Sequence, residues 1–103
     1  VSPKMETAES FFIDTIELEL KAIENLRNPN TESVIEDALN QLELLEDTYK
    51  ELVKALTTSN DDRRVVHAMI NNYQNRIAVL QDVLKLMEHM KDLKQNQDEE
   101  IYI

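Results

Sequence analysis

This 103-residue chain has no cysteine, no glycine and no tryptophan, and it contains only two prolines. The absence of cysteine excludes disulfide frameworks, thiolate metal sites and cysteine nucleophiles. The absence of glycine argues against Gly-rich phosphate-binding loops. Together with the few prolines, it also argues against folds with many turns, including those built on a parallel sheet. The composition therefore predicts one domain built from long elements with few turns.

Basic residues are also scarce, with 11 Lys and Arg against 21 Asp and Glu and a formal net charge of -10. This balance opposes the phosphate contacts that dominate nucleic-acid affinity, so DNA and RNA are not expected partners. The excess acid lies within residues 4–27 and 32–54, whereas residues 61–94 are nearly balanced. Such runs are typical of solvated helix faces, and the alternative is that they steer a basic protein partner.

No apolar run approaches the roughly 20 residues that a membrane-spanning helix requires. No signal peptide is visible either. We therefore expect that this chain does not span a membrane. It begins at Val1 rather than at an initiating Met, so an anchor or a signal upstream would not be seen in this sequence.

What the chain does contain is a set of apolar residues spaced alternately three and four apart. One run consists of Ile35, Ala38, Leu42, Leu45, Tyr49, Leu52 and Leu56. A second run consists of Val66, Ile70, Tyr73, Ile77, Leu80, Leu84 and Met87. This spacing places each run on one face of an α-helix, and its seven-residue period favours gentle left-handed packing between helices.

A third apolar stripe precedes these two runs, and it is wider than they are. It consists of Met5, Ala8, Phe12, Ile16, Leu20, Ile23 and Leu26. Phe11, Ile13 and Leu18 extend the stripe on both sides, which is the pattern expected for a helix that touches two neighbours.

The three stripes predict helices over residues 3–27, 32–57 and 62–94. Because both connections are short, consecutive helices should run antiparallel. The predicted fold is an all-α, up-down-up three-helix bundle over residues 1–94, with a helical hairpin that dimerises as the alternative. The third helix is predicted to be the longest, so its end would project beyond the bundle.

The predicted helix boundaries rest on capping residues. Ser2 is a suitable cap for the first helix, with Pro3 in its first turn. Pro29 disfavours a helical conformation at the preceding residue, so the first helix should end near Asn28. Thr31 is a suitable cap for the second helix. The break at residues 58–62 supplies several caps and two carboxylates for the third.

The segment from Gln95 to Ile103 reads as a polar spacer followed by a short acidic and apolar stretch. We expect it to be disordered, as chain ends of this composition usually are. The alternative is that Ile101, Tyr102 and Ile103 dock in a groove or pair with another chain.

Residues that carry catalytic or metal chemistry are few. His67 and His89 lie ~33 Å apart on one continuous helix at its usual rise, too far to share a metal ion. His89 with Glu88 and Asp92 is the alternative for weak metal binding, and a solvated histidine is the simpler interpretation. We predict no catalytic, cofactor-binding or metal-binding residues, no cofactor and no enzymatic activity.

The segment 71–76 is the most unusual local composition, with five polar residues around Tyr73. Arg76 lies beside the main stripe, so we expect it to reach a carboxylate of another helix in a salt bridge that sets register. The alternative is a polar docking patch formed by Asn72, Asn75 and Arg76. Methionines usually fill cores, but near the projecting end Met87 and Met90 are candidates for contact with a partner.

The stretches LEDTYKEL from Leu45 to Leu52 and VVHAMINNYQNRIAVLQDVL from Val65 to Leu84 carry a family resemblance. They resemble the extracytoplasmic region of small membrane-anchored anti-sigma factors of Bacteroidetes-type bacteria, encoded beside a sigma-70-type sigma factor. The segment TAESFFIDTIELELKAIENL fits the first helix of that family. The resemblance therefore covers most of the chain.

The resemblance implies a sigma-binding part and a membrane-spanning helix upstream of Val1, with this domain on the periplasmic side. The expected function is a non-catalytic sensing or protein-interaction domain whose partner is another protein or a second copy of itself, as a homodimer. The alternative is a soluble, cytoplasmic coiled-coil module that acts as a scaffold. The residues proposed for partner docking are Asn72, Asn75, Arg76, Met87, Met90, Ile101 and Tyr102.

Overall fold

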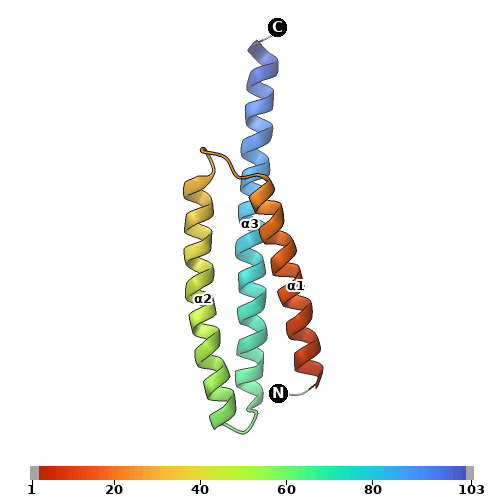
Figure 1. Ribbon diagram of the computed structural model, residues 1–103, viewed down its shortest axis with the longest axis vertical. Coiled ribbons are helices and arrows are strands. Elements are labelled where there is room, and N and C mark those ends of the chain that lie inside the picture. The colour runs from red at the N-terminus through yellow and green to blue at the C-terminus, as the bar shows by residue number, and fades with distance from the viewer. Residues whose placement is uncertain (1–2, 102–103) are drawn as a thin grey trace.

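The protein is an all-α three-helix bundle, as the sequence predicted (Figure 1). The computed structural model describes the backbone of residues 3–101 and the side chains of residues 3–95. Helix α1 spans Pro3–Asn25, α2 spans Glu32–Thr58 and α3 spans Arg63–Ile101. The bundle measures 66 × 22 × 18 Å, and its long dimension follows α3, which extends beyond the other two helices (Figure 1).

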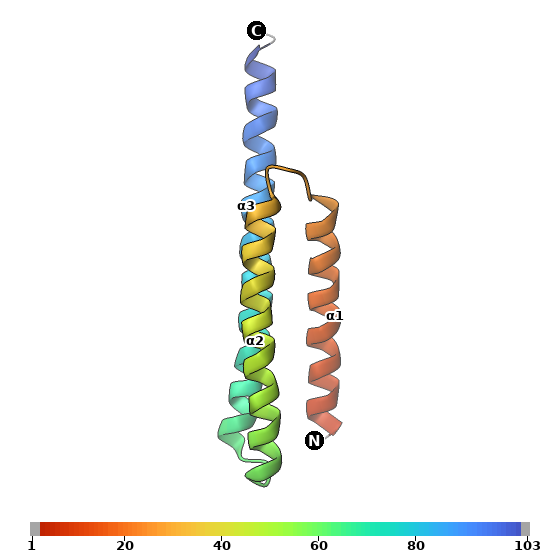
Figure 2. The ribbon, with the colours of Figure 1, turned by 60° about the vertical axis from the view of Figure 1, so that its left-hand side comes forward.

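Helix α3 is the centre of the bundle, because α1 and α2 both pack on it and make few contacts with each other. Figure 2 shows α2 in front of α3 with α1 to one side. Consecutive helices run antiparallel as predicted, but α1 packs on α3 rather than on α2. The 3–4 spacing of apolar residues in α3 supplies a stripe broad enough to serve both neighbours.

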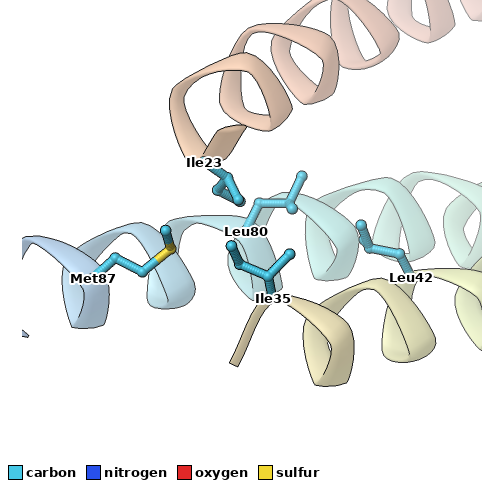
Figure 3. Close-up of a cluster of buried hydrophobic side chains, with 5 residues drawn as sticks. All are labelled: Ile23, Ile35, Leu42, Leu80 and Met87. Carbon is cyan, nitrogen blue, oxygen red and sulfur yellow. The ribbon is translucent and has the colours of Figure 1, made fainter. Parts of the chain in front are cut away.

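The core consists of two clusters along α3. The upper cluster, shown in Figure 3, brings together Ile23 of α1, Ile35 and Leu42 of α2, and Leu80 and Met87 of α3. The lower cluster contains Met5, Leu56 and Met69, one from each helix. All eight residues are buried, and burial of one such side chain contributes about 1.5–3 kcal/mol.

The expectation that Phe11, Ile13 and Leu18 pack against a second neighbour is wrong. Phe11 is 66% exposed, Ile13 is 43% exposed and Leu18 is 68% exposed. Helix α1 meets α3 along the stripe through Met5 and Ile23, and α2 does not come close enough to cover the flanks of that stripe.

Helix α1 ends at Asn25, two residues before the predicted limit. The amides of Leu26 and Arg27 donate to the carbonyls three residues earlier, at 3.0 and 3.2 Å, so the chain tightens as the helix ends. Asn28 Oδ1 then accepts a hydrogen bond from the Asn30 amide at 2.8 Å, which closes the turn. The cap predicted at Ser2 lies outside the described residues.

Thr31 precedes α2 as predicted, but its side chain does not cap that helix. Its hydroxyl accepts a hydrogen bond from the Asn28 amide at 2.9 Å and donates to the Asn28 carbonyl at 3.0 Å. The buried hydroxyl therefore holds the α1–α2 turn, because its hydrogen-bonding capacity is already used there.

The α2–α3 connection adopts left-handed backbone conformations without glycine. Asn60 has φ 56° and Asp61 has φ 63°. The Asp61 amide donates to the Leu56 carbonyl at 3.3 Å, which is the closing bond of a Schellman turn with Asn60 at the position that glycine usually occupies. Asp62 then caps α3, because its Oδ1 accepts a hydrogen bond from the Arg64 amide at 2.8 Å.

Helix α3 continues to Ile101, beyond the limit predicted at Lys94. The disorder expected for residues 95–103 stays a prediction. Residues 95–101 contain no proline or glycine, and nothing in the sequence interrupts the hydrogen-bond ladder after Lys94. Tyr102 and Ile103, the rest of the segment expected to be disordered, lie outside the described residues.

Replacing Asn60 with glycine should raise the free energy of unfolding by about 0.5–1 kcal/mol, because glycine adopts positive φ without a Cβ clash. Urea denaturation followed by circular dichroism measures the change. The same substitution at the exposed Asn40, inside α2, is the matched control and should lower stability slightly, because glycine is the poorer helix former. A loss of stability in Asn60→Gly would contradict the turn assignment.

Candidate functional site

The polar patch predicted on the middle of α3 is divided between the surface and the interior. Asn75 is exposed, whereas Asn72 and Arg76 are buried, with Arg76 only 8% exposed. A partner on the surface would therefore reach Asn75 but not the other two. Asn72 and Arg76 contact residues of the bundle itself.

Asn72 joins α3 to α2 through the backbone. Its Nδ2 donates to the Leu45 carbonyl at 2.8 Å, and its Oδ1 accepts a hydrogen bond from Arg76 Nε at 2.9 Å. Both ends of the side-chain amide are therefore used. The bond to the Leu45 carbonyl ties the middle of α3 to the middle of α2.

The salt bridge expected for Arg76 is wrong. Among the described side chains no carboxylate pairs with it, and its Nη2 is buried without a hydrogen-bond partner. The guanidinium carbon lies 4.3 Å from the ring centroid of Tyr73 and 5.0 Å from that of Tyr49. Aromatic rings occupy the space in which the sequence predicted a carboxylate, so cation–π attraction takes the place of an ion pair.

Tyr49 and Tyr73 also contact residues of α1. Phe12 stacks on Tyr73 with ring centroids 5.2 Å apart, and Tyr49 meets Tyr73 at 4.8 Å. The Tyr49 hydroxyl donates to Glu9 Oε1 at 2.7 Å, and this bond connects α2 with α1. We call these residues the central polar cluster, which consists of Glu9, Phe12, Tyr49, Asn72, Tyr73 and Arg76.

The central polar cluster has a structural role, because its contacts join the three helices. Burial raises the pKa of Tyr49 well above its ordinary value, and hydrogen bonds with Tyr73 and Glu9 raise it further. Tyr49 is therefore a neutral donor at physiological pH. Its hydroxyl has an acceptor in Glu9, so the cluster holds the three helices together.

Met87 and Met90 lie at the upper end of the bundle, in different environments. Met87 is buried in the upper core, whereas Met90 is half-buried and borders a groove of about 760 Å³ between α3 and the α1–α2 turn. We call this space the loop groove. Its apolar lining comes from Leu26, Met87, Met90 and Leu93.

The loop groove has a basic rim in an acidic protein. Lys91 and Lys94 border it, and no carboxylate is among its lining residues. Arg27 also borders it, but its charge is offset by Glu24 and Glu32, each 2.8 Å away, and the Arg27 hydrogen bond lowers the pKa of Glu24. Among the side chains of residues 3–95, neither lysine forms an ion pair.

A second, smaller groove lies between α2 and α3, with a volume of about 350 Å³. Its apolar lining comes from Val34, Ala38, Val79, Val83 and Leu86. Asp37 and Asp82 border it, so its rim is acidic where that of the loop groove is basic.

The sequence did not identify the exposed stripe on α1 as a surface feature. Phe11 and Leu18 lie one heptad apart, and Ala8, Thr15 and Ala22 fall on the same face at spacings of three and four. The signal was present in the spacing, but it was assigned to packing inside the bundle.

The last predicted docking residues lie at the end of α3. Ile101 is the final residue of that helix, and its side chain is outside the described set, as is the whole of Tyr102. Their role in docking stays a prediction.

Comparison with protein-family models, curated proteins and solved structures returned no match for this chain. In the described part of the chain, no group of three or more His, Asp or Glu side chains is arranged to hold a metal ion. None of the described helices is long and apolar enough to cross a membrane.

Replacing Arg76 with alanine should lower the free energy of unfolding by about 1–3 kcal/mol, because the stacked guanidinium and its stem leave a void. Arg76→Met keeps most of the volume, so it should cost less than Arg76→Ala, and the cost that remains reports the lost hydrogen bond to Asn72 Oδ1 and the lost cation–π contacts. Chemical denaturation of both variants measures the difference. Equal losses in the two would indicate that the charge itself stabilises the bundle.

Tyr49→Phe should reduce the dependence of stability on alkaline pH. The pKa of Tyr49 is raised in the folded state, so its stabilising effect is complete below the ordinary tyrosine pKa of 10.0 and is lost as the pH rises above it. Denaturation at pH 9 and pH ~11 should show a smaller decline for the variant than for the native chain. Equal declines would contradict the burial of this hydroxyl.

Proposed function

We propose that this chain is a non-catalytic protein-interaction domain of a membrane-anchored anti-sigma factor, located on the extracytoplasmic side. In this proposal the domain binds a protein partner and thereby influences transcription linked to the cell envelope. The support comes from an apolar surface on α1 and from the family resemblance of the sequence.

The observation that carries the proposal is the exposed stripe on α1. Phe11 and Leu18 are each about two-thirds exposed, at 66% and 68%, although side chains of this size are normally buried. Between them lies the small residue Thr15, with Ala8 and Ala22 beyond. Large residues alternating with small ones at heptad spacing form a surface on which a second helix can pack.

The charge around this stripe indicates which kind of partner would bind it. Residues 4–27 carry six carboxylates and three basic side chains. A partner helix that offers apolar residues flanked by lysine or arginine would match both the stripe and its acidic surroundings.

The resemblance supplies the cellular context of the proposal. The stretches at residues 45–52 and 65–84 resemble extracytoplasmic regions of anti-sigma factors, in which the sigma-binding part lies on the other side of the membrane. Under this proposal, a partner bound to the domain outside the membrane would change how the sigma factor is held inside.

The alternative function is a soluble, cytoplasmic oligomerisation module that acts as a scaffold. The observation that favours it is the end of α3, which continues beyond α1 and α2 (Figure 1). In that case self-association would be the activity of the domain.

Leu18→Ser in the complete protein should weaken partner binding by about tenfold, because truncating an interface anchor costs about 1–2 kcal/mol. Transcription from a promoter dependent on the neighbouring sigma factor should change accordingly. The matched control is Leu44→Ser on α2, because Leu44 has the same exposure of 68% as Leu18.

Two outcomes would contradict the proposal. If Leu18→Ser and Leu44→Ser give the same transcription, the stripe on α1 does not bind the partner. If the complete protein does not bind the neighbouring sigma factor, the anti-sigma assignment is wrong, whatever the stripe does.

A further inference from the structure

The loop groove, between α3 and the α1–α2 turn, has the size and the lining of a small-molecule site. Its volume of about 760 Å³ lies within the roughly 300–1,000 Å³ that is typical of such sites. Its apolar lining begins at Met87, which is 2% exposed, and reaches the surface at Leu93, which is 48% exposed. A ligand in the groove therefore covers apolar surface that is otherwise open to water.

The wall that the turn contributes is held by its own hydrogen bonds. The Asn28 amide donates to the Thr31 hydroxyl at 2.9 Å, and that hydroxyl donates to the Asn28 carbonyl at 3.0 Å. The Asn30 amide donates to Asn28 Oδ1 at 2.8 Å. Figure 1 shows this turn beside α3. The groove is thus formed in the free chain, and binding does not require the turn to become ordered.

The positive charge of the groove comes from α3. Lys91 and Lys94 border it three residues apart, so they occupy the same face of the helix. Neither pairs with a carboxylate among the side chains of residues 3–95. Glu88 and Asp92, the acidic residues of the same stretch of α3, are not among the lining residues. The groove therefore presents two positive charges to a ligand, and this favours an anion.

The apolar lining and the lysines follow one another along α3. Met87 and Met90 come first, and Lys94 lies ~10 Å beyond Met87 at the usual helical rise. Leu26, at the end of α1, and Leu93 line the same space. An alkyl chain that ends in a carboxylate matches this order, because its tail contacts the apolar lining while its head reaches the lysines.

The charge of the whole chain favours a small anion over an acidic protein or an anionic membrane. The formal net charge of -10 repels a large acidic surface. A small ligand in the groove lies close to Lys91 and Lys94, and exposed charges beyond the Debye length of about 8 Å are largely screened. Glu24 and Glu32 are each paired with Arg27 at 2.8 Å. The lysines therefore dominate the charge that a small ligand meets.

We propose that the loop groove binds a single-chain carboxylate, such as a medium-chain fatty acid. Its alkyl chain lies along Met87, Met90 and Leu93, and its carboxylate lies between Lys91 and Lys94. This site is separate from the exposed stripe on α1. Ligand binding in the groove and partner binding through α1 therefore stand or fall independently.

The experiment is a titration of the isotope-labelled chain with octanoate, followed by two-dimensional NMR. Octanoate should shift the amide resonances of residues 25–31 and 87–95, which contain the lining of the groove, and the shifts should saturate. Acetate has the same head without the chain, and octanol has the same chain without the charge. Each should bind at least about tenfold more weakly, because each lacks one of the two contacts that the groove offers.

Variants of the rim test the recognition of the carboxylate. Lys91→Gln and Lys94→Gln should each weaken octanoate binding by about threefold to tenfold, because each removes a charged donor. The matched control is Lys85→Gln, which removes the same charge from an exposed position of α3 outside the groove and should leave binding unchanged.

A variant of the lining tests the contact with the alkyl chain. Leu93→Ser should weaken octanoate binding by about fivefold or more, because apolar contact area is lost. The matched control is Leu86→Ser, since Leu86 is 44% exposed on the same helix and does not line the loop groove. All of these rim and lining substitutions are at exposed positions, and the NMR spectrum of each variant establishes that it is folded.

Four results would overturn the inference. Octanoate that shifts no groove resonance at millimolar concentration has no site there, and shifts centred on Phe11 and Leu18 place the alkyl chain on the α1 stripe instead. Binding that is unchanged in both lysine variants excludes recognition of the carboxylate. Groove resonances that shift on dilution of the chain alone indicate that a second copy occupies the groove. Each of these results leaves the proposed function of the α1 stripe intact.

Discussion

The burial of one stripe of α3 between two helices that scarcely touch each other is the constraint on which the rest of this structure depends. Ile23 of α1 and Ile35 of α2 meet the same residues of α3 in the upper core, and Met5 and Leu56 do so in the lower core. Because each outer helix buries its stripe against α3, the flanks of α1 remain open to solvent. The exposed Phe11 and Leu18 follow directly from this arrangement.

The central polar cluster specifies the register of the helices. The apolar core alone would allow one helix to slide along another. Apolar seams with a heptad period pack nearly as well when one helix is shifted by seven residues. The bond from Tyr49 to Glu9 and the contact of Arg76 with the Tyr49 ring are satisfied in a single register of α2, because a heptad shift would place Leu42 or Leu56 at the position of Tyr49. A shift would leave these polar groups buried without partners, at a cost of about 1–3 kcal/mol each.

The sequence predicted the fold because heptad spacing is a local property. Leu42, Leu80 and Met87 were assigned to helical seams from their spacing alone, and all three are buried. The partner of Arg76 was not predictable in this way. Its environment depends on which residue of α2 lies opposite, and that residue is Tyr49 rather than one of the many carboxylates of α2. The width of the α1 stripe was likewise ambiguous, because spacing does not reveal how many neighbours a helix has.

Because α1 and α2 make few contacts with each other, α1 and the α2–α3 hairpin differ in local stability. Helices α2 and α3 are joined by a short turn and tied by Asn72, whereas α1 is held by its seam with α3 and by the bond between Glu9 and Tyr49. Local opening in proteins follows such boundaries of contact density. Helix α1 is thus the cooperative unit that can leave first while the α2–α3 hairpin persists. Its departure would uncover the faces of Tyr73 and Leu80 that α1 now covers.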